Sequence, residues 1–76
     1  MELFHRLADA GSATARRLVV ELGLEDRVSF RNVAFDSHRD ALAARGGGET
    51  PALWDGRTLH VGIAAVRLAL EAAARG

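Results

Sequence analysis

The distribution of apolar and polar positions predicts that the chain begins with a buried strand. Between Met1 and Leu7, apolar residues fall on odd and even positions alike, which is typical of a strand covered on both faces. Small and polar residues then interrupt the pattern at Asp9, Gly11 and Ser12. We therefore expect the first strand to end in a loop that contains these three residues.

A helix and a second strand are predicted next. Apolar residues recur at the spacing of one helix face, at Ala15, Leu18, Val19 and Leu22. Gly23 follows where a helix commonly ends. The run from Val28 to Phe35 is rich in β-branched and aromatic residues and predicts a strand. A strand, a helix and a strand in this order imply a right-handed parallel crossover.

The next predicted element is a short helix. Ser37, followed three residues later by Asp40, has the form of a capping box that opens a helix running through Arg45. The glycines 46–48 then predict a flexible connector.

The chain is predicted to close with a hairpin and a third helix. Two extended runs, Pro51–Trp54 and Arg57–Val61, are separated by Asp55-Gly56, which favours a two-residue antiparallel hairpin turn. Helical spacing returns after Gly62, at Ile63, Val66, Leu70 and Ala73. The order βαβαββα predicts an α/β fold with a mixed four-stranded sheet and three helices.

Composition narrows the classes of protein to which the chain can belong. Its 76 residues predict one small domain, residues 1–76. Ten acidic and ten basic side chains balance, so the chain lacks the excess positive charge that attracts nucleic acid or anionic membranes. No apolar run approaches the roughly 20 residues of a membrane span, and no signal peptide is recognisable. We expect a cytoplasmic protein that binds neither nucleic acid nor membrane.

The absence of cysteine excludes several kinds of chemistry. Disulfides, thiolate metal sites and redox reactions through a thiol all require cysteine, and the chain contains none. The three histidines, His5, His38 and His60, have no regular metal-ligand spacing. We therefore predict neither a metal site nor a cofactor.

Two motifs resemble the thioredoxin fold in its minimal, glutaredoxin-like form. The opening Leu3-Phe4-His5-Arg6 and the following Asp9-Ala10-Gly11-Ser12 resemble the first strand and C-x-x-C loop of bacterial glutaredoxin-like proteins. Thr50-Pro51 resembles the family's threonine and cis-proline before strand three, and residues 56–62 resemble its closing hairpin. The segment 50–56 is equally similar to the N-terminal domain of glutathione transferases. The resemblance covers nearly the whole chain and implies a thioredoxin-like fold with a cis peptide at Pro51.

The chain departs from these families at the residues that perform their chemistry. In this alignment Asp9 replaces the nucleophilic cysteine and Ser12 the resolving one, so thiol–disulfide exchange is lost. The transferases hold the γ-glutamyl group of glutathione with a Glu-Ser pair, and Val61 and Gly62 stand at the matching positions. The resemblance still implies one binding feature, which is made of backbone. The residue before the cis-proline, Thr50, can pair through its N–H and C=O with an extended peptide.

The candidate site residues have structural as well as functional interpretations. Asp9 is either an anion that mimics the thiolate or, together with Ser12, simply a cap of the first helix. Ser12 is a weak candidate nucleophile, with His5 on the adjoining strand as its base. Trp54 is either a core residue or part of an interface beside the peptide groove.

These observations predict a redox-inactive, glutaredoxin-like domain that acts as a non-catalytic binding module. Its ligand would be an extended peptide or protein segment, with glutathione as a second candidate, held by Asp9, Ser12, Thr50, Pro51, Trp54, Val61 and Gly62. One alternative is a transferase-like enzyme in which the Ser12 hydroxyl activates glutathione. Another is a structural homodimer formed through the apolar faces and Trp54, so the sequence leaves open whether the chain is a monomer or a homodimer.

Overall fold

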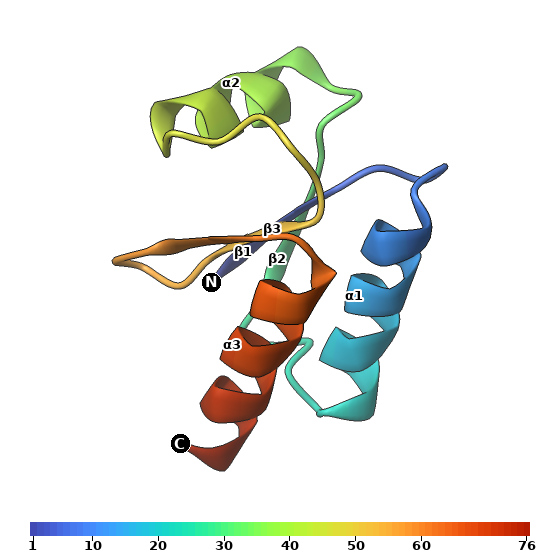
Figure 1. Ribbon diagram of the computed structural model, residues 1–76, viewed down its shortest axis with the longest axis vertical. Helices are drawn as coiled ribbons and strands as arrows, with labels where there is room; N and C mark the ends of the chain where they lie inside the picture. Colours follow the sequence, from blue (N-terminus) through green and yellow to red (C-terminus); the bar gives the residue numbers. More distant parts are fainter.

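The computed structural model describes residues 1–76 and contains strands and helices in the predicted order (Figure 1). They are β1 (Glu2–His5), α1 (Ala10–Glu21), β2 (Ser29–Asn32), α2 (Asp36–Ala44), β3 (Ala52–Trp54), β4 (Leu59–Val61) and α3 (Ile63–Arg75). The prediction of an α/β chain with the order βαβαββα is confirmed. No helix has the length and apolarity needed to cross a lipid bilayer.

The four strands form one mixed sheet in the order β2-β1-β3-β4. β1 runs parallel to β2, with Leu3 opposite Phe30. It runs antiparallel to β3, where Leu3 lies opposite Leu53, and β3 in turn pairs antiparallel with β4. The strands β1 and β3 are therefore central, and β2 and β4 form the two edges.

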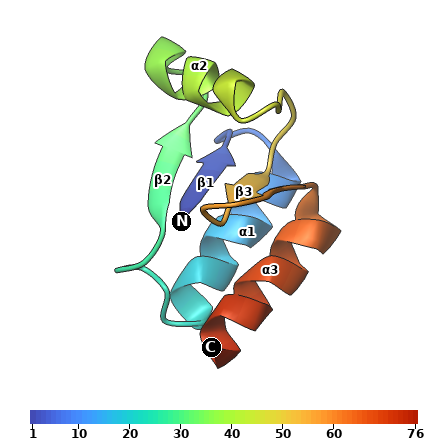
Figure 2. The same cartoon turned by 90° about the vertical axis from the view of Figure 1, so that its left-hand side faces the viewer.

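Helices cover both faces of this sheet. α1 and α3 pack side by side on one face and α2 lies over the other (Figure 2). Leu3 belongs to the larger core beneath α1 and α3, while its neighbour Phe4 belongs to the smaller core beneath α2. Both side chains are fully buried. This explains the absence of apolar–polar alternation in the first strand, since successive residues enter different cores.

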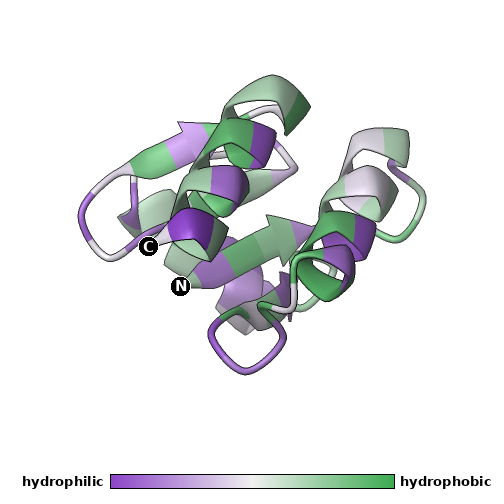
Figure 3. Ribbon diagram, turned by 90° about the horizontal axis from the view of Figure 1, so that it is seen from below, coloured by the Kyte–Doolittle hydropathy of each residue, from purple (hydrophilic) through white to green (hydrophobic).

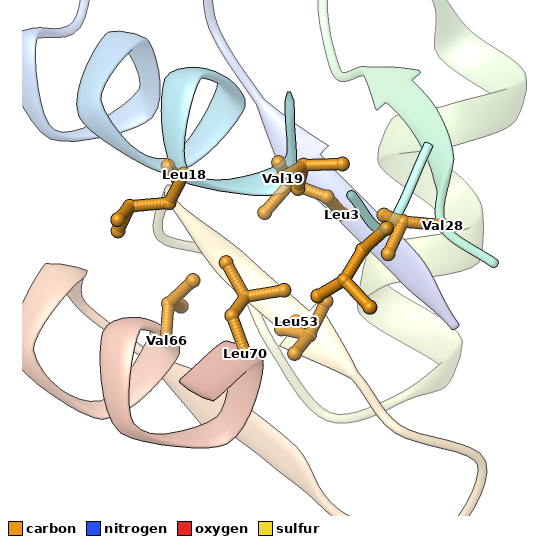
Figure 4. Close-up of a cluster of buried hydrophobic side chains, with 9 residues drawn as sticks. Leu3, Leu18, Val19, Val28, Leu53, Val66 and Leu70 are labelled. Carbon is orange, nitrogen blue, oxygen red and sulfur yellow. The ribbon is translucent and has the colours of Figure 1, made fainter. Parts of the chain in front are cut away.

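The larger core joins both ends of the chain. Leu18 and Val19 of α1 face Val66 and Leu70 of α3 (Figure 4). Leu53 of β3 contributes to this core from the sheet. These apolar positions are the ones whose helical spacing predicts the two helices, so the amphipathic pattern and the packing agree.

The predicted capping box of the second helix is wrong. α2 begins two residues earlier than predicted, since its N-cap is Phe35 rather than Ser37, and Phe35 provides no side-chain hydrogen bond. Ser37 lies inside the helix. Asp36 occupies the first turn, where its negative charge interacts favourably with the helix dipole.

The connector after α2 is more constrained than its glycines predict. A Cβ atom at Gly47 would lie 2.5 Å from Leu59 Cδ2 and 2.7 Å from Leu42 Cδ1. Leu42 is buried, so the backbone at Gly47 fills a space that a side chain would overfill. Gly47 is therefore part of the packing beneath α2.

The hairpin loop is longer than the predicted two-residue turn. Trp54 pairs with Leu59, which leaves four residues, 55–58, in the loop. The Asp55 carboxylate accepts hydrogen bonds from the backbone N–H groups of Arg57 and Thr58, both at 2.8 Å. An aspartate side chain that accepts bonds from the following backbone stabilises such a loop.

The first two strands are shorter than predicted. Leu7 and Ala8 form a turn after β1, and β2 ends at Asn32, whose side-chain oxygen accepts a hydrogen bond from Ala34 N at 2.9 Å. This local turn leaves Phe35 outside the strand.

Candidate functional site

A carboxylate and two hydroxyl groups meet where the N-terminus of α1 approaches the start of β3. Asp9 precedes α1 with extended backbone angles. Its Oδ2 accepts a hydrogen bond from Ser12 Oγ at 2.7 Å and another from Thr50 Oγ1 at 3.2 Å. The structure thus brings together three of the predicted site residues: Asp9 from the loop after β1, Ser12 from the first turn of α1 and Thr50 from the approach to β3.

Ser12 is the internal support of this cluster. Its side chain is fully buried, and its oxygen accepts a hydrogen bond from Arg6 N at 3.1 Å while its hydroxyl donates to Asp9. His5, the predicted base, makes no hydrogen bond to Ser12; its Nδ1 lies 3.0 Å from Arg16 Nη1. The predicted pairing of Ser12 with His5 is therefore wrong, and the buried hydroxyl is poorly placed to attack a ligand.

The Asp9 carboxylate is held in its ionised form. The hydrogen bond from the Ser12 hydroxyl is the main cause that lowers the pKa of Asp9. Partial desolvation opposes this effect, and the Thr50 hydroxyl and the nearby N–H groups of Gly11 and Ser12 add to it. The site therefore carries a negative charge at neutral pH.

Asp9 occupies the N-cap position without making the capping hydrogen bond. Its carboxylate is instead bound by the two hydroxyl groups. The predicted place at the helix end is confirmed. The backbone N–H groups of Gly11 and Ser12 act on the Asp9 carboxylate and lower its pKa, but no side-chain capping hydrogen bond forms. The charge still lies at the positive end of the α1 dipole, where it is favourable.

Thr50 and Pro51 form the opposite wall of the site. Their peptide bond is cis, as the family resemblance implies. Pro51 is buried, and a Cβ atom at Gly11 would lie 3.1 Å from Pro51 Cδ. Glycine at position 11 thus lets the first turn of α1 approach this segment closely.

The backbone of Thr50 has unused hydrogen-bonding capacity. Neither its N–H nor its C=O makes a hydrogen bond in the structure, whereas the carbonyl of the next residue, Pro51, accepts one from Gly62 N at 2.9 Å. An N–H and a C=O on one residue are the two groups that pair with a residue of an antiparallel strand. Thr50 can therefore receive an extended chain.

Val61 and Gly62 lie near this backbone, but Trp54 does not take part in the site. Val61 pairs with Ala52 and is 41% exposed, and Gly62 bonds to Pro51. Trp54 stands at the far end of β3, opposite Glu2. The Arg45 guanidinium lies over the Trp54 ring, 4.4 Å from the ring centroid. This cation–π contact gives the tryptophan a structural role.

The turns after β1 and β2 expose apolar side chains where the sequence predicts strands. A small cavity of about 280 Å³ is lined by Arg6, Leu7, Ala8, Asn32 and Ala34. Leu7 is 71% exposed and Phe35 63% exposed. Both residues were predicted to lie in strands, so their exposure follows only from the turns that end β1 and β2.

The structure contains no cluster of three or more side chains able to hold a metal ion. In comparisons with known proteins, no family model matches the chain, and neither a curated protein nor a solved structure matches it.

Proposed function

We propose that this protein is a redox-inactive domain of the thioredoxin-like, glutaredoxin-like kind that binds an extended segment of a partner protein through the backbone of Thr50. The observation that carries the proposal is the unpaired N–H and C=O of Thr50. Strand addition uses such groups for affinity and neighbouring side-chain pockets for specificity.

The architecture supports the family part of this proposal. The sheet order β2-β1-β3-β4, in which only β3 runs opposite to the other strands, agrees with the fold that the sequence resemblance implies. The turn after β1 and the cis peptide before β3 meet in space through the Asp9–Thr50 hydrogen bond. These are the two places where glutaredoxin-like proteins carry their motifs.

A peptide segment fits the site better than glutathione. Val61 and Gly62 replace the side chains with which the transferases hold the γ-glutamyl group, so that contact is lost. Glutathione also carries a net negative charge at neutral pH, and the ionised Asp9 carboxylate would repel it. A partner segment with a lysine or arginine beside the paired residue would instead be attracted.

The remaining alternatives receive less support. A transferase-like enzyme requires an accessible Ser12 hydroxyl, and this hydroxyl is buried and donated to Asp9. A homodimer through Trp54 requires its ring to be free, and Arg45 covers it.

Peptide selection followed by a backbone scan tests the proposed function. Random peptides displayed on phage would be selected on the immobilised protein, and the best sequence synthesised with one N-methyl group at each position in turn. Strand addition predicts that N-methylation weakens binding at alternate positions, because only every second residue directs its N–H and C=O toward the partner strand. Uniform tolerance of N-methylation would refute backbone pairing, as would a failure to select any peptide.

A titration with reduced glutathione separates the two ligand classes. We expect no saturable amide shifts at Asp9, Thr50 or Gly62 up to about 1 mM, which corresponds to a binding free energy weaker than roughly 4 kcal/mol. Localised saturable shifts at these residues would instead show that glutathione itself is a ligand.

A further inference from the structure

A second hollow lies at the opposite end of the molecule from Asp9. It has a volume of about 570 Å³ and lies between the β3–β4 loop and the last turns of α3. Its lining comes from four parts of the chain: the N-terminus, Arg27, the β3–β4 hairpin and three alanines of α3. Figure 3 views the molecule from this end, with both termini in sight. A volume of this size is within the range of small-molecule sites.

Two arginines of the lining have hydrogen-bond donors to spare. The Arg57 guanidinium makes no hydrogen bond or ion pair with the protein. Arg27 donates from Nη1 to the carbonyl oxygen of Ala73 at 3.1 Å and has no acidic partner. Other arginines of the chain, such as Arg31 and Arg45, are paired with Glu2. Two guanidinium groups without an acidic partner, those of Arg27 and Arg57, therefore line the hollow.

The one acidic residue of the lining, Asp55, is ionised, because its hydrogen bonds to His60 and to the backbone N–H groups of Thr58 and Arg57 lower its pKa to about 2. Asp55 Oδ1 accepts two backbone N–H bonds, and Oδ2 lies 2.8 Å from His60 Nε2. These contacts orient the His60 ring and hold the Asp55 carboxylate toward the loop. Asp55 therefore remains a negative charge in the lining, but its oxygens are taken up by the loop and His60, and neither Arg27 nor Arg57 forms an ion pair with it.

The floor of the hollow is small and apolar. Ala69, Ala72 and Ala73 of α3 contribute only methyl groups, so the volume beside the arginines is not filled by side chains. A ligand that fits would place an anionic group against the guanidinium groups and a compact apolar body over the alanines.

We propose that this hollow is a binding site for a small organic oxyanion, in which Arg27 and Arg57 hold a carboxylate or phosphate group and the alanines of α3 contact its apolar body. Planar guanidinium groups match both kinds of oxyanion by bidentate hydrogen bonding. The site lies apart from the Thr50 backbone and does not depend on peptide binding there.

An amide NMR titration of the full chain with phenyl phosphate, at low salt, tests the site. We expect saturable shifts at Arg57, His60 and Ala72, with a dissociation constant of about 1 mM or tighter. A parallel titration with benzoate determines whether phosphate or carboxylate is preferred. Absence of saturable shifts with both probes, or shifts centred elsewhere, would overturn the proposal.

Variants distinguish a built site from diffuse attraction of anions. We expect Arg57→Gln and Arg27→Gln each to weaken binding about tenfold, and Ala72→Leu to weaken it by filling the floor. Arg67→Gln is the matched control, because it removes the same charge from the exposed surface of α3 outside the hollow. Equal weakening by the control would overturn the site. Thermal unfolding of each variant shows whether its fold is intact. Arg57→Gln is the variant least expected to disturb the fold, because Arg57 lies on an exposed loop.

Discussion

Replacing Ser12 with alanine tests the internal support of the Asp9 site. The substitution removes one hydrogen bond to an ionised carboxylate and one accepted from the Arg6 backbone. A hydrogen bond to a charged group contributes about 1.5–3 kcal/mol and a neutral one about 1 kcal/mol. Asp9 and Arg6 lie near solvent, so in the variant water can replace part of each lost hydrogen bond. We therefore expect Ser12→Ala to lower the free energy of unfolding by roughly 2 kcal/mol.

That loss is large for so small a domain. At 0.05–0.15 kcal/mol per residue, 76 residues give a total stability of about 4–11 kcal/mol. The corresponding fall in Tm is about 10 °C, since 1 kcal/mol shifts Tm by roughly 4–8 °C at this size. Urea denaturation followed by circular dichroism measures the change directly.

A matched control and a second measurement make this prediction refutable. Ser37→Ala alters an exposed serine of α2 without a hydrogen-bond partner and should change stability by less than about 0.5 kcal/mol. In Ser12→Ala the pKa of Asp9 should also rise toward its ordinary value, because the main cause that lowers it is removed. A loss below about 0.5 kcal/mol with an unchanged Asp9 pKa would refute the hydrogen-bonded cluster.

Three further predictions concern the packing and the buried histidine. Gly47→Ala should destabilise the fold by about 1–3 kcal/mol, because the new methyl group would overlap buried Leu42; urea denaturation measures this, and an unchanged midpoint would contradict the close packing. Leu53→Ala should cost about 2–5 kcal/mol, because Leu53 is fully buried in the larger core, and a smaller loss in the same assay would contradict that burial. Burial, then the charges of Arg16 and His38, lowers the pKa of His5, so the unfolded chain takes up its proton first. The contribution of His5 to the free energy of unfolding should therefore be constant above about pH 6.5 and fall as the pH decreases below it. His5→Asn should show a smaller fall between pH 6.5 and 5 in denaturation curves, and an identical pH profile would contradict the lowered pKa.

The order of elements was predictable because each depends on a local pattern. The two apolar stripes that predict α1 and α3 form the larger core, and the mixed parity of β1 reflects its two covered faces. The errors lie where tertiary contacts outweigh local preference. Ser37 and Asp40 have the spacing of a capping box, yet α2 begins at Asp36.

The candidate site was predictable in its members and less so in its interactions. Asp9 and Ser12 are three residues apart, so their proximity follows from the helix start. The hydrogen bond from Thr50 spans 41 residues, and only the family resemblance placed Thr50 beside Asp9. No local pattern could show that the Asp9 carboxylate would accept hydrogen bonds from the Ser12 and Thr50 hydroxyls instead of capping α1. Nor could a local pattern show that Gly47 packs between two leucines.

Amide hydrogen exchange at Thr50, with and without a selected peptide, tests the central claim most directly. In the free protein this N–H has no acceptor and should exchange nearly as fast as in an unstructured chain. Saturation with the peptide should slow its exchange about tenfold or more, as expected for a hydrogen bond that adds 1.4 kcal/mol of protection. Unchanged exchange at Thr50 in the saturated complex would contradict the account, because the peptide would then be bound without pairing to this backbone.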